Sequence, residues 1–215
     1  MPHTTLIVPG FHGSGPDHWQ TWIEGHIRDA RRVVGIDWEK PVLAQWAQTL
    51  RTEIDRAHGR VWIIAHSFGC LAAVLASTSR PERVAGLMLV APADPERFGP
   101  RGLRKADDLT AQPGLSGWIP RTPLAPPSVV VASTNDPWVR FSSAMYWADC
   151  WGSQFENIGP AGHINVDSGH GPWPAGLALY EALRMASADV PLGRIPDYSV
   201  PASWRDGQEQ SGLNQ

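Results

Sequence analysis

Short apolar runs alternate along this chain with longer stretches in which apolar residues recur every three or four positions. Several of the runs are apolar throughout, which is typical of strands covered on both faces. They predict strands at residues 4–8, 32–36, 61–65, 84–90, 128–132 and 154–158. The stretches between them predict helices at residues 17–29, 42–58, 68–79, 142–151 and 173–186.

This alternation predicts the α/β class. Strands that are separated by helices join through right-handed crossovers, which give a mostly parallel, doubly wound sheet of about six strands with helices on both faces. At the start of the first helix, Asp17 is expected to be the N-cap, with Gln20 completing a capping box.

The chain has 215 residues, 42% of them hydrophobic, which is enough to bury the core of a single domain. We expect this domain to cover residues 1–190. The prolines, serines and amides of residues 191–215 leave little to bury, so we expect an extended or partly disordered tail. Seven prolines interrupt residues 93–127. This segment is either a small lid beside the catalytic edge of the sheet or an irregular surface connection.

Charge and cysteine content narrow the range of partners. The formal net charge is −3 and there is no basic run, which argues against nucleic acid and acidic membranes. No apolar stretch has transmembrane length, and the first strand begins too early for a signal peptide. The sparse pair Cys70 and Cys150 suits a cytoplasmic protein without disulfides. No zinc-binding spacing occurs, so we expect neither a metal nor a cofactor, and no protein partner is indicated.

Ser67 is the strongest candidate for chemistry. It follows an apolar run, lies between Ala65 and Gly69, and precedes a helical stretch, which is the pattern of a nucleophile elbow. A sharp strand-to-helix turn exposes the hydroxyl and needs small flanking residues. The alternative is a serine that merely caps a helix.

Asp136 and His163 complete the chain order Ser, Asp, His of this architecture. Each follows a predicted strand, so both would reach the same edge of the sheet as Ser67. The alternative for Asp136 is a turn before Pro137. His170 is a competing base, whereas His66, next to the nucleophile, is interpreted as structural.

Backbone amides complete the candidate site. The amide of Phe68 lies at the amino end of the helix after Ser67, where it can form half of an oxyanion hole. The glycine-rich segment 9–15 offers the second donor, for which Phe11 is preferred and His12 is the alternative. Neither the dinucleotide-binding nor the Walker pattern is complete in this segment.

Together these residues resemble the α/β-hydrolase superfamily, and within it the small serine hydrolases related to retinoblastoma-binding protein nine and the YdeN-like bacterial proteins. The resemblance extends over residues 4–188. Its markers are Pro9-Gly10, His18-Trp19, Asp37-Trp38, the Ala-His-Ser-Phe-Gly elbow, Asn135-Asp136-Pro137, Gly162-His163-Ile164-Asn165 and Trp173-Pro174. The chain departs from the common pattern where Ala65 replaces the first glycine of the elbow and where the oxyanion loop lacks a His-Gly-Gly-Gly run.

The resemblance implies an α/β-hydrolase fold with little or no cap and a catalytic set of Ser67, Asp136 and His163. We expect a serine hydrolase, most similar to carboxylesterases, that acts on small carboxylic esters and as a second choice on amides, through an acyl-enzyme. Because one fold hosts many functions, the alternative is a weakly active or inactive hydrolase scaffold that serves as a binding protein.

Overall fold

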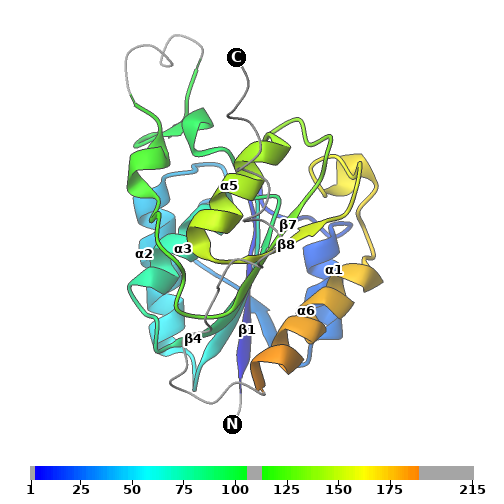
Figure 1. Ribbon diagram of the computed structural model, residues 1–215. Coiled ribbons are helices and arrows are strands. Elements are labelled where there is room, and N and C mark those ends of the chain that lie inside the picture. The colour runs from blue at the N-terminus through cyan, green and yellow to red at the C-terminus, as the bar shows by residue number, and fades with distance from the viewer. Residues whose placement is uncertain (1–2, 106–112, 189–215) are drawn as a thin grey trace, which may run out of the picture.

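The computed structural model of the protein describes residues 3–105 and 113–188 (Figure 1). The expected tail at residues 191–215 lies outside these residues, as does the predicted end of the domain at residue 190. No helix within the two described ranges combines the length and the apolar composition needed to cross a bilayer.

One six-stranded sheet forms the centre of the protein, and all of its neighbouring strands run parallel. In spatial order the strands are β2 (Ala30–Arg32), β1 (Thr4–Val8), β3 (Val61–His66), β4 (Val84–Val90), β7 (Ser128–Ala132) and β8 (Gln154–Asn157). This arrangement confirms the predicted α/β class. Because the strands are parallel, their carboxyl ends meet at one edge of the sheet, where the candidate residues follow β3, β7 and β8.

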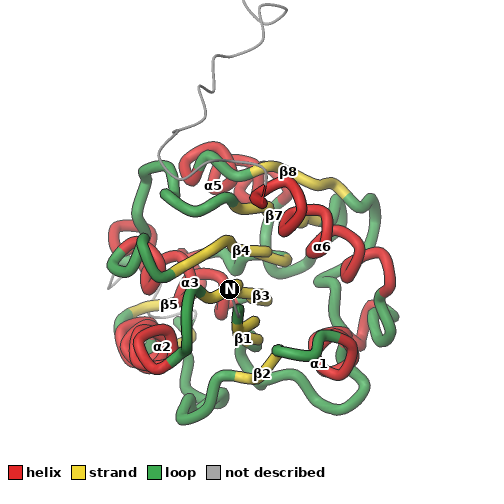
Figure 2. The backbone as a smooth tube through the Cα atoms, turned by 90° about the horizontal axis from the view of Figure 1, so that it is seen from below, coloured by secondary structure: helices red, strands yellow, loops and turns green. Residues whose placement is uncertain are grey.

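Helices cover both faces of the sheet (Figures 1 and 2). On one face lie α2 (Leu43–Arg56), α3 (Phe68–Thr78) and α5 (Phe141–Trp151), whose buried side chains share a core with β3 and β4. On the other face, α1 (Trp19–His26) and α6 (Pro174–Ala188) form a second core. The near-continuous apolar strands follow from this double cover, since alternate side chains of each strand enter opposite cores.

The second strand was predicted too late in the chain. β2 spans Ala30–Arg32 instead of residues 32–36, and Gly35 turns the chain away with a φ of 81°. The prediction failed because β2 is an edge strand with polar side chains. Arg31 pairs with Glu53, and Arg32 pairs with Glu24. The apolar Val34, which suggested a strand, is instead 64% exposed.

The predicted cap of the first helix was also wrong. His18, not Asp17, is the N-cap of α1, and its Nδ1 accepts a hydrogen bond from the Gln20 amide. The Gln20 side chain turns inward, where its Nε2 donates to the carbonyl oxygens of Val8 and Ile64 at 3.1 and 3.2 Å. A buried side-chain amide that links β1 to β3 is a tertiary contact, which local capping rules do not detect.

The described parts of residues 93–127 pack on the protein as short elements. They include the 3-10 helices Pro95–Arg97 and Leu115–Trp118 and the antiparallel pair β5 (Phe98–Gly99) and β6 (Gly102–Leu103). Phe98 and Leu115 are buried in the core beside α3, and the Phe98 ring lies 4.5 Å from that of Phe68. Residues 106–112, which belong to the segment expected to be a lid or a surface connection, lie outside the described residues.

Candidate active site

Ser67 occupies the turn between β3 and α3 with a φ of 51° and a ψ of −123°. This backbone conformation is rare for a residue with a side chain, and it is the strained turn that the sequence pattern predicted. Gly69 must lack a side chain here, because a Cβ atom would lie 2.7 Å from the Val8 carbonyl oxygen and still closer to that of Pro9. The turn at Ser67 therefore packs closely against the end of β1.

The three candidate side chains meet at the carboxyl edge of the sheet. The Oγ atom of Ser67 lies 2.9 Å from Nε2 of His163. Nδ1 of the same ring lies 2.8 Å from Oδ2 and 3.0 Å from Oδ1 of Asp136. The structure thus brings together residues that are up to 96 positions apart in the sequence.

Hydrogen bonding fixes the proton positions in this chain of contacts. The Asp136 side chain is fully shielded from solvent, and its Oδ1 also accepts hydrogen bonds from the amides of Trp138 and Val139. The oxygens of a carboxylate can only accept hydrogen bonds, so Nδ1 of His163 is the donor to Asp136. Nε2 of His163 is then free to accept the hydrogen bond of the Ser67 hydroxyl.

Hydrogen bonds hold the loop that carries His163 at nearly every residue. From the end of β7, the Thr134 amide donates to Gly159, Ser133 Oγ accepts from Ala161, and Asn135 Oδ1 accepts from Gly162. Beyond His163, Trp19 Nε1 donates to the Ile164 carbonyl at 2.7 Å.

Sequence reasoning missed Ser133, Asn135 and Trp19. Asn135 and Trp19 belong to the markers Asn135-Asp136-Pro137 and His18-Trp19, so these motifs could have pointed to both residues.

The other histidines have different surroundings. His170 contacts Ser168 through Nδ1 and makes no hydrogen bond to Ser67, so the geometry favours His163 as the base over its competitor. His18 and His66 are buried beside the site. Burial is the main cause that lowers the pKa of His18 to about 4, and the nearby Arg32, His163 and His170 lower it further. Burial is also the main cause that lowers the pKa of His66 well below its ordinary value.

The segment after β1 passes directly beside Ser67. A Cβ atom on Gly10 would lie 2.8 Å from the Ser67 Cβ, so only glycine permits this approach. The His12 amide donates to the Trp38 carbonyl at 3.0 Å and is therefore occupied. Across residues 3–105 and 113–188, the amides of Phe11 and Phe68 have no hydrogen-bond acceptor. They are the two candidate oxyanion donors of the sequence analysis.

Aromatic and basic side chains border the site. Trp138, 40% exposed, lies 6.1 Å from the His163 ring between centroids. The Arg97 guanidinium stacks on the Trp138 ring at 4.3 Å from its centroid and donates to the Pro137 and Trp138 carbonyls. The segment after β4 is thus joined to the loop that carries Asp136.

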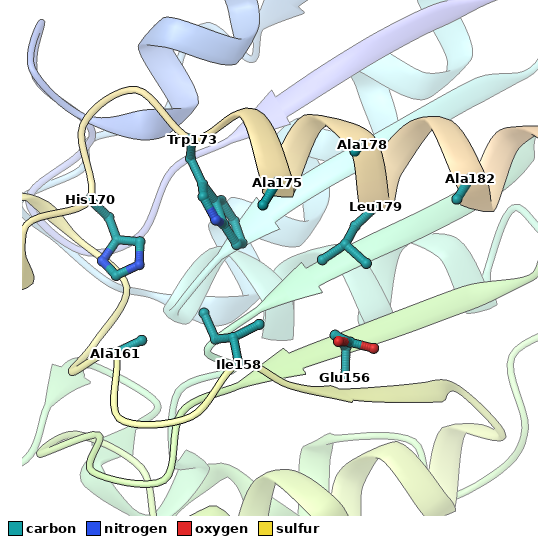
Figure 3. Close-up of a pocket in the computed structure, with 9 residues that line it drawn as sticks. All are labelled: Glu156, Ile158, Ala161, His170, Trp173, Ala175, Ala178, Leu179 and Ala182. Atoms are coloured by element: carbon teal, nitrogen blue, oxygen red, sulfur yellow. The ribbon is translucent and has the colours of Figure 1, made fainter.

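A groove lies away from Ser67 on another part of the protein. About 490 Å³ in volume, it separates the edge strand β8 from α6, and Trp173 and Leu179 point into it toward Ile158 and Glu156 (Figure 3). Ser67 does not line it. Within the described part of the chain, no three His, Cys, Asp or Glu side chains are grouped so that they could hold a metal ion.

Comparison with known proteins agrees with the geometry of the candidate site. Residues 5–182 match the family model described as serine hydrolase. The chain belongs to the serine hydrolase family. No curated protein matches it.

Several solved hydrolase structures are similar to this serine hydrolase. A YdeN-like hydrolase from Pectobacterium atrosepticum is 36% identical, with a TM-score of 0.73 over 86% of this chain and 92% of its own. The ydeN gene product of B. subtilis is 20% identical, with a TM-score of 0.66 over 85% and 98% of the two chains. Alpha/beta hydrolase domain-containing protein 10 from mouse is 14% identical, with a TM-score of 0.61 over 87% and 88%. The last two comparisons show the fold alone.

Proposed function

We propose that this serine hydrolase is a carboxylesterase-like enzyme that cleaves small carboxylic esters, and more slowly amides, through an acyl-enzyme on Ser67. The supporting observation is the continuous hydrogen-bond chain from the Ser67 hydroxyl through His163 to the buried carboxylate of Asp136. A serine outside such an arrangement is a weak nucleophile near neutral pH.

In the acylation step, the Ser67 oxygen bonds to the ester carbonyl carbon while its proton passes to Nε2 of His163. The carbonyl electrons move to the oxygen and form a tetrahedral oxyanion, and Asp136 stabilises the imidazolium. The oxyanion then collapses, the bond from carbon to the alcohol oxygen breaks, and His163 gives its proton to the leaving alkoxide. Deacylation repeats these events with a water molecule in place of the serine.

The two unoccupied amides support the oxyanion assignment. Phe68 begins α3, so its N–H is one of those left without a partner inside the helix, at the positive end of the helix dipole. Phe11 follows Gly10, which lies in contact with Ser67. Two N–H donors that converge beside the nucleophile stabilise the charge that develops in the transition state.

The two cysteines support a cytoplasmic location. Cys70 is buried and Cys150 is half-buried, and both are free thiols. Free thiols are typical of reducing compartments.

A fluorophosphonate probe tests the proposed mechanism. It reacts with a serine whose base and oxyanion donors are assembled, so we expect stoichiometric labelling of the wild type and none of Ser67→Ala, as measured by intact mass. The matched control is Ser77→Ala, because Ser77 is a buried serine of α3 whose hydroxyl donates to the Val74 carbonyl and not to a histidine. Absence of wild-type labelling would instead favour the inactive scaffold that serves as a binding protein.

A panel of p-nitrophenyl esters with increasing acyl length would define the substrate range. We expect the highest kcat/KM for short acyl chains and lower values for the corresponding anilides. Hydrolysis that increases steadily with chain length would contradict the small-ester assignment.

A further inference from the structure

We propose that His66 is a positioning residue that couples the base to the nucleophile. Its ring N–H holds the main-chain carbonyl of His163, while its own main chain leads directly into Ser67. The inference rests on the proposed function, in which Ser67 and His163 react together.

The contact itself is well defined. Nε2 of His66 lies 2.9 Å from the His163 carbonyl oxygen, and the residue is only 5% exposed. A carbonyl oxygen can only accept, so Nε2 must carry a proton, and in the neutral ring Nδ1 is then the unprotonated nitrogen. The neighbours of the ring fix its plane, since the ring of Trp19 meets it edge-on at 5.8 Å and that of His18 lies 5.1 Å away.

The peptide that His66 holds is strained. Ile164 has a φ of 50°, which is unfavourable for a β-branched residue and must be imposed by its surroundings. Two ring N–H groups hold this turn, from His66 to the carbonyl of His163 and from Trp19 to that of Ile164. Without the first of them, the turn could relax and carry the imidazole away from Ser67.

The hydrogen bond of His66 comes from a different strand than the bonds that hold residues 159–162 of this loop. Ser133, Thr134 and Asn135 hold residues 159–162 from the end of β7, which is the strand that precedes Asp136. They therefore fix the base relative to the acid. His66 is the last residue of β3, so its bond fixes the base relative to the nucleophile.

The neutral state of His66 suits this role. Its ring lies 4.9 Å from the ring of His163, which becomes an imidazolium during the reaction. Burial and the nearby His163, His18 and His170 lower the pKa of His66 well below its ordinary value, so the ring donates a hydrogen bond without adding a second positive charge.

The test compares His66→Leu, which removes the donor, with His66→Gln, whose side-chain amide can reach the same carbonyl. Fluorophosphonate labelling rates and ester kcat and KM are measured for variants with matched unfolding midpoints. We expect His66→Leu to lower the labelling rate and kcat about tenfold to a hundredfold, with KM nearly unchanged, since small errors in base placement have effects of this size. We expect His66→Gln to recover most of the loss.

Equal labelling of the wild type and His66→Leu would overturn the positioning role, whereas a wild type that is not labelled would overturn the proposed function. A further measurement on the wild type needs no variant to fold. Nitrogen-15 NMR of His66 should show the Nε2–H tautomer with slow proton exchange. The opposite tautomer or a charged ring would also refute the inference.

Discussion

At the scale of single residues, backbone strain is concentrated at the candidate site. Among the described residues, four non-glycine positions have a left-handed φ: His12, Ser67, Ala91 and Ile164. His12 lies in the oxyanion segment, Ala91 follows the β4 residue that bonds the Ser67 amide, and Ile164 follows His163. Such conformations persist only where surrounding contacts impose them, and they are typical of functional sites.

This strain gives a prediction about stability. Ser67→Gly removes the hydroxyl and also the Cβ that makes a φ of 51° unfavourable, whereas Ser67→Ala removes only the hydroxyl. We expect the free energy of unfolding in urea to be about 1 kcal/mol higher for the glycine variant than for the alanine variant. Equal values, or a less stable glycine variant, would mean that the elbow stores no strain.

At the scale of elements, the sequence patterns located the helices and most strands well. The predicted helix at residues 68–79 is observed at Phe68–Thr78, and the strand at 128–132 is observed with the same bounds. Buried elements have strong apolar periodicity, which explains this success. The predictions for the edge strand β2 and for the cap of α1 were wrong, because polar residues there bond to partners on other elements.

The cap of α1 predicts a dependence of stability on pH. The pKa of His18 is lowered from 6.5 to about 4 in the folded protein. The unfolded chain therefore binds a proton first, and this contribution to stability is present above pH 6.5 and lost as the pH falls toward 4. The shift corresponds to about 3 kcal/mol at about 1.4 kcal/mol per pH unit.

His18→Asn tests this contribution, since asparagine is a good N-cap and does not titrate. We expect the unfolding free energy of this variant, measured in urea between pH 7 and pH 4, to decrease less steeply than that of the wild type. His18→Ala is the matched control, which lacks both the cap and the titration and should be about 1 kcal/mol less stable than His18→Asn at pH 7. Parallel curves for the wild type and His18→Asn would contradict the assignment.

At the scale of the whole molecule, the site depends on three segments that converge. Ser67 follows β3, Asp136 follows β7 and His163 follows β8, and these strands are placed side by side or nearly so in one sheet. Their side chains meet because parallel strands end at a common edge. The three residues should therefore act as a unit.

Cooperation of this kind predicts non-additive losses of activity. We expect Ser67→Ala, His163→Ala and the double variant to reduce ester kcat by a similar factor, on the order of a millionfold, and Asp136→Asn by about ten-thousandfold. The measurement is steady-state hydrolysis of a p-nitrophenyl ester, with unfolding midpoints as the control for folding. Losses that multiply in the double variant would show that Ser67 and His163 act independently.

The sequence by itself determined the α/β class, the elbow at Ser67 and the chain order of Ser67, Asp136 and His163. These features could be predicted because periodicity and small flanking residues involve only neighbouring positions, and the order of residues is a property of the sequence itself. Only the tertiary structure decided that His163 rather than His170 reaches Ser67, that the His12 amide is occupied, and that His66 bonds the loop of the base. Each of these depends on which groups lie within about 3 Å after folding, a distance that residues far apart in the chain acquire only when the strands pair.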